Sequence, residues 1–305
     1  MGLMQPELSI VFVNYNSAGF LATALASLRQ AEPDLAVEII VVDNASQDPA
    51  EVVTVCQRHN CQLVMQKRNR GYGAAANRGF QAARGEFLAV ANPDLVFEAP
   101  VLTPLVRFLK EHPRVGVVSP QLLYRDGTPQ PSARRFPRLR YVFAGRRSVV
   151  ARLLPRLSGA EEFQYAGIAT ASEPVPVEAV IGTLMVFRRQ ALEQVGGFDE
   201  GFFLFAEDID ICRRLHQKGW QVFVVPTVKI VHAVGQVRWR FRRVTEFYRM
   251  RSLRRLFLAE THGFMVAVIQ LLFVCYLSIH QAAELVGISE FEYSWTEAAR
   301  TRRKQ

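Results

Sequence analysis

The sequence predicts an α/β fold in which a mostly parallel central sheet is flanked by helices on both faces. The first 95 residues alternate short apolar runs, rich in Ile, Val and Phe, with segments of helical pattern, the first of which carries Leu21, Leu25 and Leu28 on one face. The apolar runs suit buried strands and the one-sided segments suit helices. Regular alternation of the two is typical of a parallel sheet with crossover helices. Polar clusters also follow four of the predicted strands, at the edge where such sheets bind ligands.

The elements of the N-terminal half follow from their hydrophobic pattern and their capping residues. The first helix follows Asn16 and Ser17, either of which can cap it. Pro49 lies in the first turn of the second helix, where its missing N–H costs no hydrogen bond. The predicted strands cover residues 8–16, 37–46, 62–66, 85–94 and 115–124, and the predicted helices cover residues 18–31, 48–59, 71–83 and 100–112.

The second half begins with a stretch that has no regular period. Residues 125–178 are rich in Arg, Pro, Gly and Ser, which predicts loops and short helices. A strand over 179–189 follows, and then two helices that end at Gly196 and Gly219, since glycine commonly ends a helix. The run 221–232 is predicted to close the sheet.

The chain is expected to hold one large domain, 1–236, with halves at 1–120 and 121–236, followed by a basic and apolar helical extension over 237–305. Residues 264–279 are almost wholly apolar, although a full membrane span needs about 20 residues. This helix can therefore span a membrane, lie on its surface, or pack on the large domain and join a homodimer. The sequence leaves all three open.

The net charge of +9 is concentrated in two arginine-rich stretches. Residues 134–156 hold eight arginines and no acid, and residues 238–255 hold eight arginines and one acid. Such patches suit an anionic surface or ligand, such as lipid phosphate or nucleic acid. The second stretch lies directly before the apolar helix, which favours the face of an anionic lipid leaflet.

The cysteines and the N-terminus predict a cytoplasmic protein. The four cysteines form no CxxC pair and no disulfide-type framework, which suits reduced thiols. The apolar run near the N-terminus lacks the basic flank of a signal peptide. We therefore expect a protein at the cytoplasmic face of the inner membrane, either peripheral or anchored by its C-terminal helix.

Seven short motifs occur in a specific order: VNYNS, VVDNASQD, NRGYGAAANRG, NPD, IGTLMVFRR, GGFDEGFFLFAEDIDICRRLHQKGW and VHAVG. In this order they resemble family 2 glycosyltransferases, and most of all the bacterial rhamnosyltransferase-like branch, over about residues 8–260. The resemblance implies a GT-A fold, a nucleotide-diphospho-sugar donor and inversion at the anomeric carbon. It makes 1–120 the nucleotide-sugar-binding half and 121–236 the acceptor-binding half.

For donor binding, Asp43 matches a carboxylate that accepts a hydrogen bond from the pyrimidine N–H or the ribose. A carboxylate suits an imide N–H because it accepts without offering a donor. On position alone, Asp43 can equally be a turn or helix cap, and the glycine-rich turn near Gly71 can be simple packing. Arg70 can pair with the diphosphate. The nucleotide-sugar-binding residues implied by the resemblance are Asn14, Asn16, Asp43, Asn69, Arg70, Gly71, Asn77 and Asn92.

For a metal, the resemblance implies Asp94 and His232. NPD stands where many family members carry an Asp-x-Asp metal motif, and Asn92 replaces its first carboxylate. Hard oxygen ligands select Mg²⁺ or Mn²⁺. With one protein carboxylate, the site should be weak until donor phosphates complete it. The alternatives are that NPD is an ordinary turn and that His232 is structural.

For catalysis, Asp208 matches the general base that takes a proton from the acceptor hydroxyl. Glu207 and Asp210 are expected to raise its proton affinity through like-charge repulsion. Glu207 can instead orient the acceptor, and the sequence does not separate these roles. The alternative without a catalytic role is an ordinary helix start whose acidic side chains face solvent.

On the acceptor side, the resemblance implies Gly182, Thr183 and Phe205, with the aromatic residues near Phe205 excluding water. Arg188 and Arg189 either neutralise the acids or the diphosphate, or form an ordinary surface pair. A Trp at 220 suits core packing better than sugar binding.

The leading hypothesis is a metal-dependent inverting glycosyltransferase that moves rhamnose from dTDP-rhamnose onto a lipid-linked or cell-surface glycan. A UDP-hexose donor is the alternative within the same fold. A sugar-phosphate nucleotidyltransferase would need an N-terminal glycine-rich loop with a cation, which VNYNSAGFL lacks. A basic nucleic-acid-binding protein is a third hypothesis, prompted by the arginine stretches, but no known nucleic-acid motif accompanies them.

Overall fold

The computed structural model describes residues 6–138, 165, 167–233, 242–259 and 261–285. The chain forms two compact units, and we describe each by itself. The first consists of residues 1–136 and 164–256, and the second of residues 137–163 and 257–305. Residues up to 256, which include most of the basic helix, belong to the first unit, and the predicted domain division near residue 236 stays a prediction.

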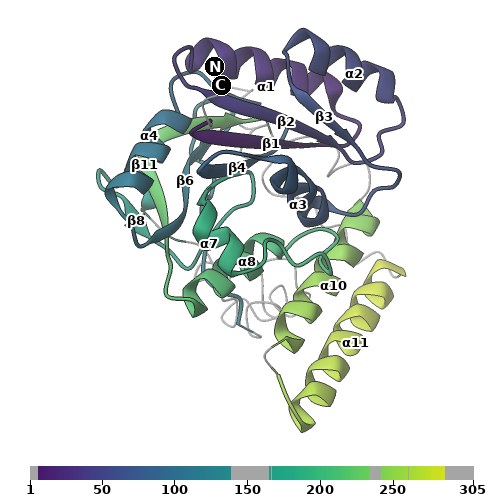
Figure 1. The fold of residues 1–305 in the computed structure, drawn as a ribbon. Helices are drawn as coiled ribbons and strands as arrows, with labels where there is room; N and C mark the ends of the chain where they lie inside the picture. The colour runs from purple at the N-terminus through teal and green to yellow at the C-terminus, as the bar shows by residue number, and fades with distance from the viewer. Residues whose placement is uncertain (1–5, 139–164, 166, 234–241, 260, 286–305) are drawn as a thin grey trace, which may run out of the picture. The chain divides into compact units, whose positions relative to one another are not determined.

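The main sheet of the first unit is mostly parallel, as predicted (Figure 1). Its strands, in order across the sheet, are β3 (Gln62–Met65), β2 (Val37–Asp43), β1 (Leu8–Asn14), β4 (Phe87–Ala91), β10 (Leu184–Arg188), β6 (Val115–Leu123), β11 (Gln221–His232) and β5 (Leu95–Val96), with β8 (Val175–Pro176) also on β11. Strand β10 is antiparallel to both of its neighbours, and β5 and β8 are antiparallel to β11. The run predicted to close the sheet, β11, is therefore not its last strand, because β5 pairs with β11 at the edge.

Helices cover both faces of this sheet (Figure 1). Inward-facing residues of β1 such as Ile10 and Phe12 form one core with the helices on the first face. The helices on that face are α1 (Ala18–Ala31), α2 (Pro49–Arg58) and α4 (Leu102–Glu111), and those on the other are α3 (Tyr72–Ala82), α7 (Arg189–Gln194) and α8 (Glu207–Gln217). On the second face α3 packs closely on β1, where a Cβ on Gly79 would lie 2.2 Å from Val11.

The starts of α2 and α4 are capped by side chains, one of them local and the other distant in the sequence, whereas α1 has no side-chain cap. Asp48 caps α2 by accepting from the N–H groups of Ala50 and Glu51, and Pro49 lies in the first turn as predicted. Ser17 precedes α1, but its hydroxyl donates to the carbonyl of Tyr15 and does not cap the helix. The start of α4 is capped from elsewhere in the chain, since the buried carboxylate of Glu32 accepts from three consecutive N–H groups of residues 101–103.

The predicted strand over 179–189 is broken into two. Strand β9 (Ala179–Val180) pairs with β7 (Ala133–Arg134) in a small separate sheet, and only β10 joins the main sheet. Gly182 lies between the two strands and its peptide groups bond to side chains. Its N–H donates to Asp208 and its carbonyl accepts from Tyr72.

In the second unit, α11 (Phe264–Leu285) is longer than the predicted 264–279. The preceding helix α10 (Arg242–Leu258) runs across the boundary between the units. Phe273 of α11 is buried and its ring lies 6.2 Å from that of Phe257, whereas Phe264 and Leu271 are exposed. Within the described residues, no helix has both the length and the apolar character needed to cross a membrane.

Candidate functional site

Four strand ends place polar residues along one edge of the sheet. Strands β1 and β2 end in register at Asn14 and Asp43. Strand β4 ends at Ala91 beside the start of β10, and the next N–H, of Asn92, donates to the carbonyl of Thr183 at 2.9 Å. Parallel strands bind ligands at such an edge. The predicted donor-side and acceptor-side residues therefore begin from the same edge of the sheet.

Asp43 lies at the centre of a buried polar cluster. Its carboxylate accepts from Asn14 Nδ2 at 2.9 Å, from Ser46 Oγ at 2.5 Å and from the Ser46 N–H at 3.0 Å. The local turn role that the sequence left open is thus present. The Oδ1 atom of Asn14, which is fully buried, has no partner within the described structure. A buried acceptor of this kind is suited to a ligand donor.

The backbone beside this cluster adopts unusual conformations. Asn16 and Ala45 both have positive φ, at 51° and 65°. The N–H of Asn16 donates to Ser46 Oγ at 2.8 Å, and Asn16 Oδ1 accepts from the Gln47 N–H at 2.7 Å. Non-glycine residues in this region are uncommon, and they gather at binding sites where the surroundings hold them.

Asn44, which the sequence analysis did not single out, holds the glycine-rich loop. Its Nδ2 donates to Asn69 Oδ1 at 2.9 Å and to the Gly71 carbonyl at 3.1 Å, while its Oδ1 accepts from the Arg70 N–H. The Asn44 side chain is buried, and its bond to the Gly71 carbonyl is buried with it. The only sequence signal for this role was that an asparagine directly follows Asp43.

Gly71 is required where the loop meets the segment before α8. Its φ is +92°, and a Cβ there would lie 2.3 Å from the carbonyl oxygen of Phe203. The N–H of Tyr72 donates to that same carbonyl at 3.1 Å. No larger residue fits without moving backbone. The loop at 67–72 therefore contacts the segment that leads into the acidic cluster, which consists of Glu207, Asp208 and Asp210 at the start of α8.

Arg70 and Asn77 are committed to contacts within the protein. Arg70 forms an ion pair with Glu200 at 2.7 Å, with both side chains about half exposed. Asn77 donates to the carbonyl of Phe198 and accepts from the N–H of Phe198, both at 2.9 Å. Both ends of the Asn77 amide thus hold the loop at 198–200.

The three acids at the start of α8 are buried, with exposures of 7% for Glu207, 6% for Asp208 and 4% for Asp210. The alternative of a solvent-facing helix start is therefore wrong. Asp210 pairs with Arg213 at 3.3 Å and Arg214 at 2.8 Å. We expected Asp210 to raise the proton affinity of Asp208, but these two guanidinium groups balance its charge.

Glu207 and Asp208 have different surroundings. Asp208 Oδ2 accepts from the Gly182 N–H at 3.0 Å and Oδ1 from the Ile209 N–H at 2.9 Å. Glu207 Oε2 is buried and has no partner within the described structure. Burial, with Asp208 as a second cause, raises the pKa of Glu207 to about 8. Glu207 is therefore mostly protonated at neutral pH.

Tyr72 is the second residue that sequence reasoning missed. Its hydroxyl donates to the Gly182 carbonyl at 2.7 Å. Burial raises the pKa of Tyr72 well above its ordinary value, and the charges of Glu207, Asp208 and Asp94 raise it further. The predicted base Asp208 and the predicted metal ligand Asp94 therefore both lie near enough to act electrostatically on one tyrosine.

The segment before Glu207 is held under backbone strain. Phe205 and Ala206 are consecutive residues with φ of 68° and 64°, and each such residue costs about 1–3 kcal/mol. The cost is offset by neighbouring contacts: Ser252 Oγ donates to the Leu204 carbonyl at 2.8 Å, and the Phe203 ring stacks on Tyr248 at 4.4 Å. Phe205 is thus placed directly beside the acidic cluster.

Asp94 and His232 are brought together by the pairing of β5 with β11. His232 Nε2 lies 3.3 Å from Asp94 Oδ1, and the Asp94 carbonyl accepts from the Ala233 N–H. A carboxylate beside an imidazole is a donor set that suits Mn²⁺ or Mg²⁺ with further oxygen ligands. No cluster of three or more His, Cys, Asp or Glu suited to a metal occurs in the described part of the chain.

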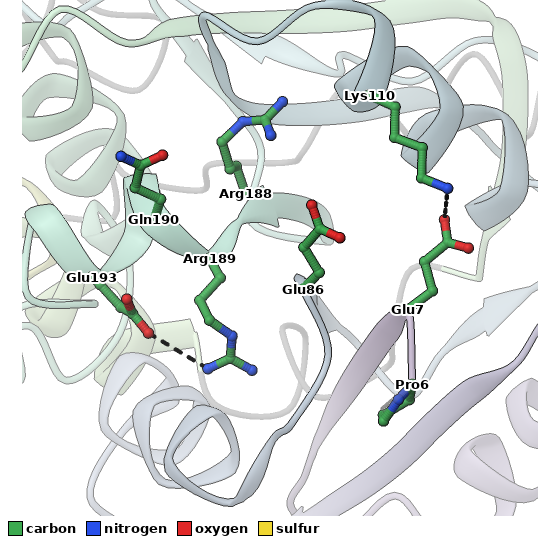
Figure 2. A pocket seen from close by; sticks show the side chains of 8 residues that line it. All are labelled: Pro6, Glu7, Glu86, Lys110, Arg188, Arg189, Gln190 and Glu193. Carbon is green, nitrogen blue, oxygen red and sulfur yellow. Dashed lines mark ion pairs between the residues drawn. The ribbon is translucent and has the colours of Figure 1, made fainter. Parts of the chain in front are cut away.

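Arg188 and Arg189 lie at the opposite edge of the sheet, so neither balances the acidic cluster. Arg188 donates to the carbonyls of Leu109 and Val115, and Arg189 to those of Gly85 and Ala83. They border a pocket of about 630 Å³ (Figure 2). It is lined by Pro6, Glu7, Glu86, Lys110, Arg188, Arg189, Gln190 and Glu193. Lys110 forms an ion pair with Glu7, and Arg189 forms one with Glu193. The pocket lining therefore carries both positive and negative charge.

Comparison with known families gives two matches. Residues 9–196 match Glycosyl transferase family 2, and residues 148–298 match Glycosyl transferase family 21. The chain is 31% identical over 241 residues to an N-acetylglucosaminyl-diphospho-decaprenol L-rhamnosyltransferase of Mycobacterium tuberculosis, covering 75% of this chain and 76% of that protein. It is 24% identical over 233 residues to the rhamnosyltransferase WbbL of Escherichia coli, covering 73% and 82% of the two chains.

Solved structures with the same fold include two that were determined with manganese. The mannosyltransferase PcManGT from Pyrobaculum calidifontis, in complex with GDP-Man and Mn²⁺, has a TM-score of 0.58 at 20% identity and covers 98% of this chain and 80% of its own. GalNAc-T7 with UDP, GalNAc and Mn²⁺ has a TM-score of 0.55 at 17% identity and covers 75% and 44%. The fold is therefore GT-A, as the sequence motifs implied.

Proposed function

The chain belongs to glycosyltransferase family 2, and on this premise we propose that it is a metal-dependent, inverting rhamnosyltransferase. The observation that carries the proposal is that Asp208 and Tyr72 both bond to Gly182, at the sheet edge where β2 ends at Asp43. Gly182 is next to Thr183, whose carbonyl accepts from the N–H of Asn92, two residues before Asp94. The family assignment leaves sugar-phosphate nucleotidyl transfer and nucleic-acid binding without support.

The nucleotide is proposed to bind at the ends of β1 and β2. Asp43 retains acceptor capacity on Oδ2, which takes only the Ser46 N–H in the described structure. An imide N–H of the base, or a ribose hydroxyl, would complete it. The partnerless Oδ1 of Asn14 supplies a second buried acceptor next to it. The N–H groups at the start of α3 would face the diphosphate, since helix starts favour anions.

The proton from the acceptor hydroxyl is proposed to go to Asp208. Two backbone N–H groups hold its carboxylate in place, and a positioned base is worth about 10²- to 10⁴-fold in rate. Attack from the face opposite the leaving diphosphate gives inversion. Glu207 carries its own proton at neutral pH, so it does not compete as a base and can donate a hydrogen bond to the acceptor.

Asp94 and His232 are proposed to hold a divalent ion together with the donor diphosphate. Bound there, Mn²⁺ or Mg²⁺ would balance the negative charge that develops on the departing diphosphate. Asn69, Arg70, Gly71, Asn77 and Asn92 stay as proposed donor-side residues, with Asn77 and Arg70 acting through the loop contacts described above. Gly182, Thr183 and Phe205 are the proposed acceptor-side residues.

The substrate is proposed to be dTDP-rhamnose with a lipid-linked or cell-surface glycan acceptor, and a UDP-hexose is the alternative donor. The support is the name of the Mycobacterium tuberculosis relative, which describes a rhamnosyltransferase and a decaprenol-linked acceptor. The exposed apolar residues of α11 and the arginines of α10 support a further proposal, that the enzyme lies on the cytoplasmic face of an anionic membrane.

The test is release of nucleotide diphosphate when purified enzyme, Mn²⁺, donor and a polyprenyl-diphospho-N-acetylglucosamine acceptor are combined. The expected result is dTDP release from dTDP-rhamnose that requires the acceptor, with an inverted anomeric configuration in the product. UDP release from a UDP-hexose would support the alternative donor. Turnover that is unaffected by a metal chelator would contradict metal dependence.

A further inference from the structure

A glutamine beside the proposed metal ligands occupies a fixed position. Gln130 is buried, and its backbone N–H donates to the Leu122 carbonyl at 2.8 Å. Its own carbonyl accepts from Gln121 Nε2 at 2.7 Å. The side chain then reaches the end of β11, where His232 lies. Nothing in the proposed function uses this residue.

The orientation of the Gln130 amide is set by its neighbours. Nε2 lies 2.9 Å from the His232 carbonyl oxygen and 3.0 Å from the Leu123 carbonyl oxygen. Carbonyl oxygens only accept, so the NH₂ group must face both of them. The reversed amide would set an oxygen against two oxygens in a buried site, which is unfavourable. Oε1 therefore points to His232 Nδ1, at 3.0 Å.

This contact selects one tautomer of His232. Because Oε1 is an acceptor, the Nδ1 atom opposite must carry a hydrogen. In the neutral imidazole the other nitrogen, Nε2, then has a free lone pair. Nε2 lies 3.3 Å from Asp94 Oδ1, and both side chains are largely buried, at 15% and 13% exposed. Two electron-pair donors thus face the same small volume, and either a divalent cation or a proton on Nε2 satisfies both.

We propose that Gln130 is a positioning residue that holds His232 in the Nδ1–H tautomer, so that Nε2 and Asp94 together can bind a divalent cation. The inference rests on the proposed function, in which these two residues hold the metal with the donor diphosphate. Outer partners of this kind fix the ring orientation of metal-binding histidines. The competing arrangement is a protonated His232 that forms a plain ion pair with Asp94.

The tautomer can be measured without metal or substrate. Long-range ¹H–¹⁵N correlation spectra of the full chain with ¹⁵N-labelled histidine, at about pH 8.5 where an ordinary imidazole is neutral, distinguish the two tautomers. His232→Gln assigns the signal. The expected result is a protonated Nδ1 and a bare Nε2 in the wild type, with Gln130→Met shifting the population to Nε2–H. An Nε2–H tautomer or an imidazolium in the wild type would overturn the proposal.

Metal affinity gives the second readout, by Mn²⁺ electron paramagnetic resonance in the presence of dTDP. Gln130→Met should weaken Mn²⁺ binding about 10- to 100-fold. Gln130→Glu keeps an acceptor for Nδ1–H, so it should bind Mn²⁺ more tightly than Gln130→Met, although its second oxygen faces the carbonyls of His232 and Leu123 and should lower the melting temperature. The matched control is Gln194→Met, because Gln194 Oε1 likewise accepts from a ring N–H, that of Trp220, at 2.8 Å but far from the site.

The outcomes separate the inference from the function on which it rests. If the wild type binds Mn²⁺ and turns over donor while Gln130→Met binds equally tightly, the role of Gln130 is refuted and the proposed function stands. If the wild type binds no Mn²⁺ with dTDP, the metal part of the proposed function fails, and the inference fails with it. Equal losses of Mn²⁺ affinity in Gln130→Met and Gln130→Glu, measured on the folded proteins, would also refute a tautomer-specific role.

Discussion

The N–H of Gly182 lies 3.0 Å from Oδ2 of Asp208, so a residue that interrupts a predicted strand also orients the proposed base. The same peptide segment is held from its other side, where the Gly182 carbonyl accepts from the Tyr72 hydroxyl at 2.7 Å. A chain of contacts thus runs from the start of α3 to the carboxylate of Asp208. Its consequences can be measured with single substitutions.

Asp208→Asn should lower kcat by about 10²- to 10⁴-fold, because the amide keeps the shape of the carboxylate but cannot take the acceptor proton. Donor binding should be nearly unchanged, since no predicted donor contact is removed. Steady-state kinetics and a donor titration check both parts. Near-normal turnover by a folded Asp208→Asn protein would show that another group is the base.

Tyr72→Phe should lower kcat about threefold to tenfold, which corresponds to the loss of one hydrogen bond that positions Gly182. The KM for the donor should change less than about twofold, because the ring stays in place. Tyr165→Phe is the matched control, since the Tyr165 hydroxyl also bonds a backbone group, the N–H of Glu178 at 2.9 Å. A Tyr72→Phe enzyme with unaltered kcat would mean that Gly182 is held without this bond.

Glu207→Gln should make the protein more stable at high pH. The folded-state pKa of about 8 lies above the ordinary value of 4.5, so folding retains a proton that the unfolded chain loses. The stability of the wild type should therefore fall as pH rises from about 4.5 to about 8 and level off above that. Urea unfolding across this range should show that the free energy of unfolding of Glu207→Gln rises relative to that of the wild type. Parallel curves for the two proteins would contradict the assignment.

Glu32→Ala should lower the free energy of unfolding by about 2–3 kcal/mol, because it leaves the buried N–H groups at the start of α4 without an acceptor. Glu32→Gln keeps an oxygen at the same place and should cost less. Urea denaturation measures both. Because Glu32 lies away from the acidic cluster, a kcat change larger than the fraction unfolded explains would be inconsistent with a purely structural role.

The sequence predicted the elements that depend on local pattern. The alternation of strands and helices from Leu8 to Leu123 is confirmed, since apolar runs and caps act over a few residues. The antiparallel direction of β10 was not predicted, because it is set by pairing with β4 and β6. The break at Gly182 was not predicted either, because it depends on Tyr72 and Asp208 in distant parts of the chain. A hydrogen bond between residues 110 positions apart leaves no periodic signal.

The site follows the same division. Motif order located Asp43, Asp94 and Asp208, while their roles remain predictions. Asn44 and Tyr72 were missed because each is an ordinary polar residue whose importance appears only when its partners are known. The acids were expected to act on one another as a trio, and the pairing of Asp210 with Arg213 and Arg214 was overlooked, although its i,i+3 and i,i+4 spacing on the predicted helix indicates it.

The contact of Gly71 with the carbonyl of Phe203 has a consequence for engineering. Because one residue of the loop touches the segment that leads into Glu207, selection for a new sugar nucleotide cannot vary the loop freely. Libraries aimed at altered donors should therefore keep Gly71 and Tyr72 constant and place their diversity elsewhere. Variants that change Gly71 or Tyr72 are expected to have a lower catalytic rate, whichever sugar nucleotide they bind.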